Sequence, residues 1–183
     1  MTGIVRLILV SHAMTDAMAA ARFPADEPLN DIGRRQIEAV ADVDLRGAAR
    51  RLAGPEERAR QTAQCLGLQA TAEPRLGDID YGRWRGEKLD SIHPKELEVW
   101  LNDPARAPHG GESIVDLLDR VAGWLKSLTD SAVRTVAVTH PAVIRAAILL
   151  ALDVPPKSFW RIDIAPVSQT VLHFRGGCWS LRL

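Results

Sequence analysis

Two short apolar runs, each typical of a buried strand, end in a histidine. Residues 4–10 lead into Ser11 and His12, and residues 135–139 lead into His140. The carboxyl ends of strands in an open parallel sheet face the binding crevice. Two strands that end in histidine can therefore bring two imidazoles to one site, and the sequence predicts a site at this edge of a sheet.

Strand-like and helical patterns alternate along the chain. The clearest helix follows Ser113, where apolar residues recur at i, i+3, i+4 and i+7 up to Leu128. Further helices are expected at 31–43 (with Asn30 or Asp31 as N-cap), 57–66, 96–101 and 141–152, strands at 4–11, 49–53, 134–139, 167–174 and 179–183, and an irregular segment at 76–86. The alternation predicts a three-layer α/β/α sandwich with a mostly parallel central sheet. The length of 183 residues favours one domain, residues 1–183.

Composition removes several classes of function. Lys plus Arg and Asp plus Glu each number 23, so the formal net charge is zero, which argues against a nucleic-acid binder. Cys65 and Cys178 are too few for a disulfide framework and are expected to be small apolar packing residues.

No secretory signal or membrane-spanning run is visible, so a cytoplasmic location with no membrane contact is expected. The chain lacks a P-loop and a dinucleotide fingerprint, and we predict no cofactor.

Between the two histidines, residues 54–63 are typical of a loop that opens a helix, with Arg58 near its start. A planar guanidinium offers paired donors that match phosphate oxygens. Two imidazoles and this arginine suit the handling of a phosphoryl group. His12 and His140 have no evident third ligand, and the other histidines lack metal-ligand spacing, so no metal site is predicted.

Six segments follow one another in a recognisable order. They are Ser11-His12-Ala13, Arg22 with residues 26–29 and Gly33, residues 54–63, residues 76–86, residues 110–113, and Thr139-His140 with Arg145. In this order they resemble the histidine phosphatase superfamily, which includes the cofactor-dependent phosphoglycerate mutases. The family has Arg-His-Gly at the first segment, Ser-Pro-Leu-x-Arg at the third and Gly-Gly-Glu-Ser at the fifth. The resemblance covers nearly the whole chain and implies a phosphoglycerate mutase-like α/β fold.

The resemblance also implies a mechanism. His12 would attack phosphorus and form a phosphohistidine, which splits one displacement into two easier ones. Arg58 and His140 would donate hydrogen bonds to the phosphoryl oxygens. Asp78 matches the family's acid, which protonates the leaving oxygen and needs a raised pKa. Asp80 is a nearby carboxylate that could supply the repulsion for that shift.

The candidate substrate-binding residues are Ser11, Thr15, Arg22 and Glu112. Arg22 is either a substrate-phosphate contact or a solvated loop residue. Glu112 precedes the start of a helix. Its negative charge is explained either by a favourable interaction with the helix macrodipole or by a place near the substrate pocket. Asp78, in a glycine-rich segment, is either the acid or part of an Asx-type turn.

Three positions depart from the family pattern. Ser11 replaces an arginine that binds phosphate, and losing one such donor costs about 3 kcal/mol by analogy with other single-donor deletions. Met18 stands where the family commonly has a phosphate-binding Asn, and Asp78 is one methylene shorter than the usual Glu. Arg22 and Arg60 are the candidates to compensate for Ser11.

The function expected from this resemblance is a metal-independent phosphatase that hydrolyses a small phosphomonoester through phospho-His12. The alternatives are a catalytically weak or inactive phosphate-binding protein of the same fold, which Ser11 and Met18 motivate, and a phosphoglycerate mutase. A mutase needs extra enclosing segments, for which this chain is short. The expected ligand is a small phosphorylated metabolite or inorganic phosphate, and tryptophan-bearing surfaces are compatible with a homodimer.

Overall fold

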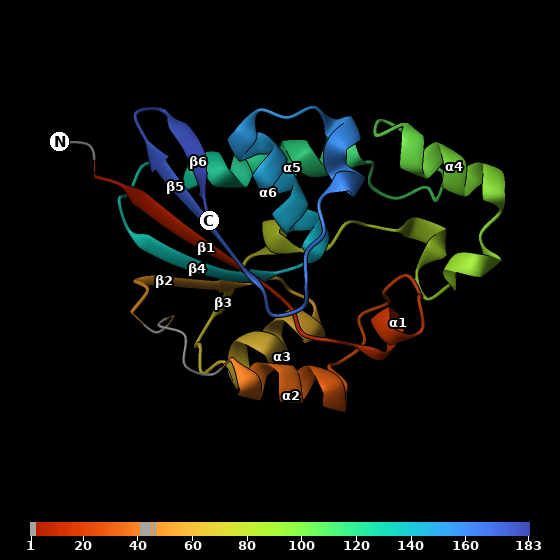
Figure 1. Ribbon diagram of the computed structural model, residues 1–183, viewed down its shortest axis with the longest axis horizontal. Helices are drawn as coiled ribbons and strands as arrows, with labels where there is room; N and C mark the ends of the chain where they lie inside the picture. Colours follow the sequence, from red (N-terminus) through yellow and green to blue (C-terminus); the bar gives the residue numbers. More distant parts are fainter. Residues whose placement is uncertain (1–2, 41–44, 46) are drawn as a thin grey trace.

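The computed structural model describes residues 3–40, 45 and 47–183. Its strands are β1 (Val5–Ser11), β2 (Arg50–Ala53), β3 (Thr71–Ala72), β4 (Arg134–Thr139), β5 (Gln169–Arg175) and β6 (Cys178–Arg182). In this part of the chain they form one sheet in the order β3-β2-β4-β1-β5-β6 (Figure 1). The pairs from β3 to β1 are parallel and those from β1 to β6 are antiparallel. The prediction of a mostly parallel sheet is confirmed.

Helices lie on both faces of this sheet. They are α1 (Asp16–Ala19), α2 (Asp31–Ala39), α3 (Glu57–Cys65), α4 (Pro94–Asn102), α5 (Ile114–Ser127) and α6 (Pro141–Leu152), with 3-10 turns η1 (Pro74–Leu76), η2 (Gly82–Trp84), η3 (Leu89–Ser91) and η4 (Pro156–Arg161). Figure 1 shows α5 and α6 over one face and α2 and α3 over the other. The three-layer α/β/α prediction is therefore confirmed. In the part of the chain described, no helix is long and apolar enough to cross a membrane.

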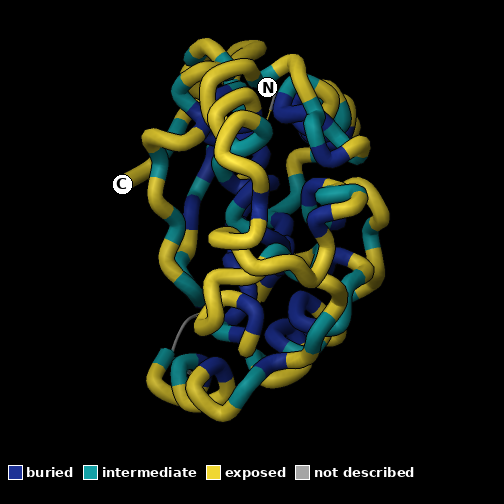
Figure 2. Tube along the Cα trace, turned by 90° about the vertical axis from the view of Figure 1, so that its right-hand side faces the viewer, coloured by how far each residue is buried: buried dark blue, intermediate teal, exposed yellow. Residues whose placement is uncertain are grey.

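Strand β1 lies in the interior of the sheet and contributes side chains to the apolar clusters on both of its faces. Leu7 and Leu9 join the large apolar cluster under α5 and α6, whereas Ile8 and Val10 join the cluster under α3. This division follows from the alternation of side chains along a strand. Figure 2 shows the buried residues gathered inside the trace, with exposed residues on the outer turns. Burial on both faces explains why residues 7–10 form a continuous apolar run.

Most element predictions agree with the structure, and the differences have local causes. Helix α5 begins as predicted because Ser113 and Asp116 form a capping box. The helix expected at 96–101 begins earlier, at Pro94, where a fixed φ suits the first helical position. Asn30 is the N-cap of α2, and residues 41–43 of the helix predicted there lie outside the described residues. The packing role expected for Cys65 and Cys178 is wrong, because both are exposed free thiols.

Candidate active site

The two strand-end histidines meet at one edge of the sheet. Strands β1 and β4 are parallel neighbours whose register sets Ser11 opposite Thr139, so the next residues, His12 and His140, leave the sheet side by side. Their ring centroids are 5.1 Å apart. Both rings are buried, with 4% of His12 and 0% of His140 exposed. Pro141 occupies the first position of α6, as its fixed φ predicts.

His12 is arranged as a neutral imidazole. Its Nδ1 lies 2.8 Å from the carbonyl oxygen of Ala13, which can only accept, so Nδ1 carries the proton and Nε2 the lone pair. Burial, with the charges of His140 and Arg58, lowers the pKa of His12 from 6.5 to about 3. A neutral ring with a free Nε2 lone pair at pH 7 is the form that a nucleophile requires.

Arg58 comes from the first turn of α3, directly after the loop that leaves β2. Its side chain is buried, and Nη2 donates to Asp78 Oδ2 at 2.8 Å. The Nε and Nη1 atoms of Arg58 have no hydrogen-bond partner among the described residues. Buried donors without partners are costly, and an anion with several oxygens would satisfy them. The structure thus brings Arg58 to the two histidines.

Asp78 lies between Arg58 and His140. Its Oδ1 accepts a hydrogen bond from Ile79 N at 2.9 Å, and its Oδ2 is 3.6 Å from His140 Nδ1. Burial alone would raise the pKa of this carboxyl, but His140 and Arg58 outweigh it and hold the pKa below its usual range. The raised pKa expected from Asp80 is wrong for this arrangement, because the Asp80 carboxylate turns away and accepts from Gly82 N at 2.9 Å.

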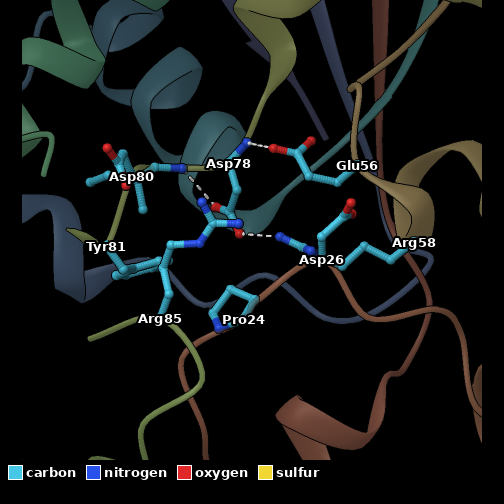
Figure 3. A pocket seen from close by; sticks show the side chains of 9 residues that line it. Pro24, Asp26, Glu56, Arg58, Asp78, Asp80, Tyr81 and Arg85 are labelled. Atoms are coloured by element: carbon cyan, nitrogen blue, oxygen red, sulfur yellow. Dashed lines mark hydrogen bonds and ion pairs between the residues drawn. The ribbon is translucent and has the colours of Figure 1, made fainter. Parts of the chain in front are cut away.

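Glu56 belongs to the site, although sequence reasoning gave it no role. Its Oε2 lies 2.7 Å from His140 Nε2, and its Oε1 accepts from Asp78 N at 2.9 Å. Burial works against ionisation, but the hydrogen bond from His140 prevails and lowers the pKa of Glu56 to about 2. Figure 3 shows Glu56, Arg58 and Asp78 converging. The sequence did carry a signal for this role, because the charged Glu56 stands where the family pattern Ser-Pro-Leu-x-Arg has an apolar leucine.

A cavity of about 250 Å³ opens in front of His12. The candidates Thr15 and Arg22 both line it, as do Tyr81 and Arg145, which were not predicted as site residues. Thr15 is buried and also caps α1 by accepting from Met18 N, whereas Arg22 is exposed. A smaller adjoining cavity of about 140 Å³ is the one in Figure 3, and its further lining includes Asp26, Asp80 and Arg85.

Three other candidates lie away from these cavities. The Ser11 hydroxyl donates to the carbonyl oxygen of Ala165 and accepts from Ser168 N, so the loop before β5 occupies it. Glu112 forms an ion pair with Arg120 at 2.8 Å and lines neither cavity. Arg60 is exposed and lines neither cavity, so it does not replace the missing cation at position 11.

Arg120 explains why Glu112 stands where it does. Its guanidinium donates to the carbonyl oxygens of Gly77 and Asp78 at 3.0 and 3.3 Å, while Glu112 holds it from the other side. This pair therefore fixes the backbone that carries Asp78.

Among the described residues, no group of three or more His, Cys, Asp or Glu side chains is placed to hold a metal ion.

Known proteins resemble this chain over most of its length. A bifunctional protein of Mycobacterium tuberculosis is 30% identical over 192 residues, which cover 97% of this chain and 53% of that protein. The chain therefore spans about half the length of this curated relative. Phosphoserine phosphatase 1 of Hydrogenobacter thermophilus is 27% identical over 92% of this chain and 86% of its own length.

Solved structures share the fold. A protein described as mycobacterial hydrolase 1 superposes with a TM-score of 0.88 at 27% identity, covering 98% of this chain and 97% of its own. A mycobacterial glucosyl-3-phosphoglycerate phosphatase in complex with VO3 gives a TM-score of 0.87 at 28% identity, covering 98% of both chains. The pattern of the histidine phosphatase superfamily (branch 1) matches residues 7–183. The predicted resemblance is confirmed, and this chain belongs to the histidine phosphatase superfamily.

Proposed function

We propose that this chain is a phosphatase that hydrolyses a small phosphomonoester through a phosphohistidine on His12. One observation carries the proposal: unpartnered buried nitrogens of Arg58 and His140 flank the free Nε2 of His12. A phosphoryl group supplies acceptors for both sets of donors and an electrophile for the lone pair. The family match and the phosphatase relatives support a phosphoric monoester hydrolase.

In the first step, His12 Nε2 attacks phosphorus in line with the ester oxygen. The P–N bond forms as the P–O bond breaks, and Arg58 stabilises the equatorial oxygens. Asp78 gives a proton to the leaving oxygen, so an alcohol departs. In the second step, water loses a proton to Asp78 and attacks phosphorus, the P–N bond breaks, and phosphate and neutral His12 are regenerated.

Asp78 must be protonated before the first step, although it is ionised in the free site. A bound phosphoryl dianion competes for the donors of Arg58 and His140 and adds negative charge beside the carboxylate. Both effects favour the protonated carboxyl, so substrate binding is expected to raise the pKa of Asp78. The acid is therefore prepared by the substrate itself, and Asp80 is not required.

The substrate proposed is a small phosphorylated metabolite, which suits a cavity of about 250 Å³ beside His12. The route uses an imidazole nucleophile and needs no metal or organic cofactor. The cytoplasmic location, the lack of nucleic-acid partners and the homodimer stay predictions from the sequence.

A second candidate is a phosphate-binding protein with little or no turnover. The observation that favours it is Ser11, whose hydroxyl is bound to Ala165 and Ser168 and leaves the site one cation poorer than the family pattern. Such a protein would hold phosphate through Arg58 without modifying His12. Phosphoenzyme formation separates the two candidates.

The experiment is hydrolysis of an aryl phosphate with EDTA present, comparing the wild type with His12→Ala. Turnover that survives the chelator and vanishes in the variant supports the phosphohistidine route, and quenched enzyme should carry a base-stable, acid-labile phosphoryl group. Phosphate binding without turnover, between pH 5 and 8 and on a panel of esters, would favour the binding protein.

A further inference from the structure

His140 is held at Nε2 by a half-buried carboxylate, that of Glu56. The Nε2 of His140 is 2.7 Å from Glu56 Oε2, and none of the imidazole is exposed. Because a carboxylate only accepts, Nε2 carries the donated proton. The same carboxylate accepts from the Asp78 backbone through Oε1, so it is fixed at both oxygens. Glu56 is therefore placed to act on the chemistry of His140.

Gly54 makes room for this contact. A Cβ added at position 54 would lie 3.0 Å from His140 Nε2 and 3.1 Å from Glu56 Oε2, and 2.8 Å from the Leu76 carbonyl oxygen. The family pattern has serine and leucine where this chain has Gly54 and Glu56. The glycine removes a side chain beside Nε2, and the glutamate places its carboxylate next to that nitrogen. The two departures act together on one nitrogen of His140.

The pairing decides what the other nitrogen of His140 can do. With Nε2–H given to Glu56, a neutral ring has only a lone pair at Nδ1, and a phosphoryl oxygen also has only lone pairs. Nδ1 can donate to such an oxygen only when the ring is doubly protonated. A carboxylate within hydrogen-bond distance stabilises that imidazolium.

On the basis of the proposed function, we propose that Glu56 is a positioning residue that keeps His140 as an imidazolium with Nδ1–H available to the phosphoryl group. The charged and titratable groups that face His140 are Glu56, Asp78 and His12, with Arg58 beyond Asp78. Asp78 Oδ2, at 3.6 Å from Nδ1, marks the side on which the phosphoryl oxygen would be received. The imidazolium then supplies a cation in a site that lacks the family's arginine at position 11.

The test compares Glu56→Gln with the matched control Glu57→Gln. The glutamine amide at position 56 keeps one oxygen that can accept from Nε2, but its NH2 group cannot accept from Asp78 N, so the substitution removes the charge and that one backbone hydrogen bond. Glu57 lies one residue further on the same helix end, contacts Gln61 and lines neither cavity, so its variant removes the same charge elsewhere. The readouts are the pH dependence of kcat/KM on an aryl phosphate and the ¹⁵N shifts of the site imidazoles with inorganic phosphate bound.

For Glu56→Gln we expect the alkaline limb of kcat/KM to move down by about one pH unit, because the lost carboxylate no longer stabilises the imidazolium. At pH 8 the loss is then about tenfold, and it is much smaller at pH 5.5. The Nδ1 resonance should show a proton at pH 7.5 in the wild type, and the variant should lose that proton at a lower pH than the wild type does. Glu57→Gln should follow the wild type in both readouts.

An equal loss of kcat/KM at every pH would assign Glu56 a purely structural role and overturn the proposal, as would an unprotonated Nδ1 in the phosphate-bound wild type. Glu56→Asp, which keeps the charge on a shorter stem, should retain the wild-type alkaline limb if it folds. The ¹⁵N readout needs no turnover. A wild type that binds phosphate without hydrolysis would therefore refute the proposed function while still testing the role of Glu56.

Discussion

Burial of His12 couples the stability of this protein to pH. The folded-state pKa is about 3, against 6.5 for the free side chain. Between these values the unfolded chain takes up a proton that the folded protein does not, so stability is complete above pH 6.5 and falls as pH decreases. At pH 5 the loss from this residue is expected to be about 2 kcal/mol. Urea unfolding of the wild type at pH 7.5 and pH 5 measures the change.

His12→Asn is the comparison, since it removes the titrating ring and keeps a polar side chain of similar position. His109 and His173 also have lowered pKa values, so they contribute a slope of the same sign in both proteins. The Glu56 contribution also has this sign, because its pKa is lowered to about 2, but it is lost only below pH 4.5. Identical pH slopes in wild type and His12→Asn would contradict the buried neutral His12 described above.

Asp78→Asn tests the acid role directly. If Asp78 protonates the leaving oxygen, alkyl phosphates need it far more than aryl phosphates, whose leaving oxygen is stable without a proton. We expect kcat to fall about 100-fold or more on an alkyl phosphate and less than about tenfold on a nitrophenyl phosphate. The measurement is the steady-state kcat of the wild type and of Asp78→Asn on each of the two esters. Equal losses on both would assign Asp78 to the orientation of Arg58 alone.

The candidate site was predictable where residue type and position in the chain define the role. His12 and His140 follow strands that are parallel neighbours, and Arg58 opens the helix after β2, so the topology alone brings them together. Glu56 and Ser11 were not predictable. Their roles depend on which way a side chain turns, and only the loops around them decide that Ser11 faces Ala165 and Glu56 faces His140.

Alanine substitutions at two helical glycines, Gly33 and Gly123, are expected to change the free energy of unfolding in opposite directions. Gly33, near the start of α2, is in contact with the backbone of Met14, so an added Cβ would collide with its carbonyl oxygen. Gly123 lies on α5 with nothing within 4 Å of an added Cβ. Gly33→Ala should lower the free energy of unfolding by about 2 kcal/mol through overpacking. Gly123→Ala should raise it by about 0.5–1 kcal/mol through helix propensity.

Urea unfolding at pH 7.5 checks both variants, and each is the control for the other because the chemical change is the same. Gly33→Ala should also weaken phosphate binding, since Met14 lies two residues after His12 and the strain would reach the loop that carries the nucleophile. If the two alanines change stability equally, the packing of α2 against this loop is looser than the structure indicates.

Long, strongly patterned elements were predicted well, and so was the short strand β2, whereas the shortest strand and the shortest α-helix, β3 and α1, were not predicted. Helix α5 has an apolar stripe and a capping box in its own sequence, so local information is sufficient. Strand β3 has two residues and exists because Leu52 and Ala53 of β2 offer them pairing partners. Helix α1 has four residues, and Thr15 caps it. Such elements depend on tertiary contacts that no window of sequence contains.

The cavity beside His12 is assembled from segments that are distant in the chain. Residues around α1, the start of α3, the turn at Tyr81 and the start of α6 all line it. Their side chains include the cations Arg22, which is exposed, and Arg145, which is half-buried. Arg145 donates through Nε to the Ile162 carbonyl oxygen at 2.7 Å, and it lies over Phe159 and Trp160. This fixed cation therefore borders the same cavity as His12.

A leaving group with its own negative charge should therefore be preferred. We expect the phosphomonoester of a small hydroxy acid to have a kcat/KM about tenfold above that of the ester of the matching neutral alcohol, since one charge-assisted hydrogen bond contributes about 1.5–3 kcal/mol before desolvation is subtracted. Arg145→Met should remove this preference. Arg161→Met removes an exposed arginine that does not line the cavity, and it should keep the ratio. An unchanged ratio in Arg145→Met would show that this cation serves packing against η4 and not recognition of the substrate.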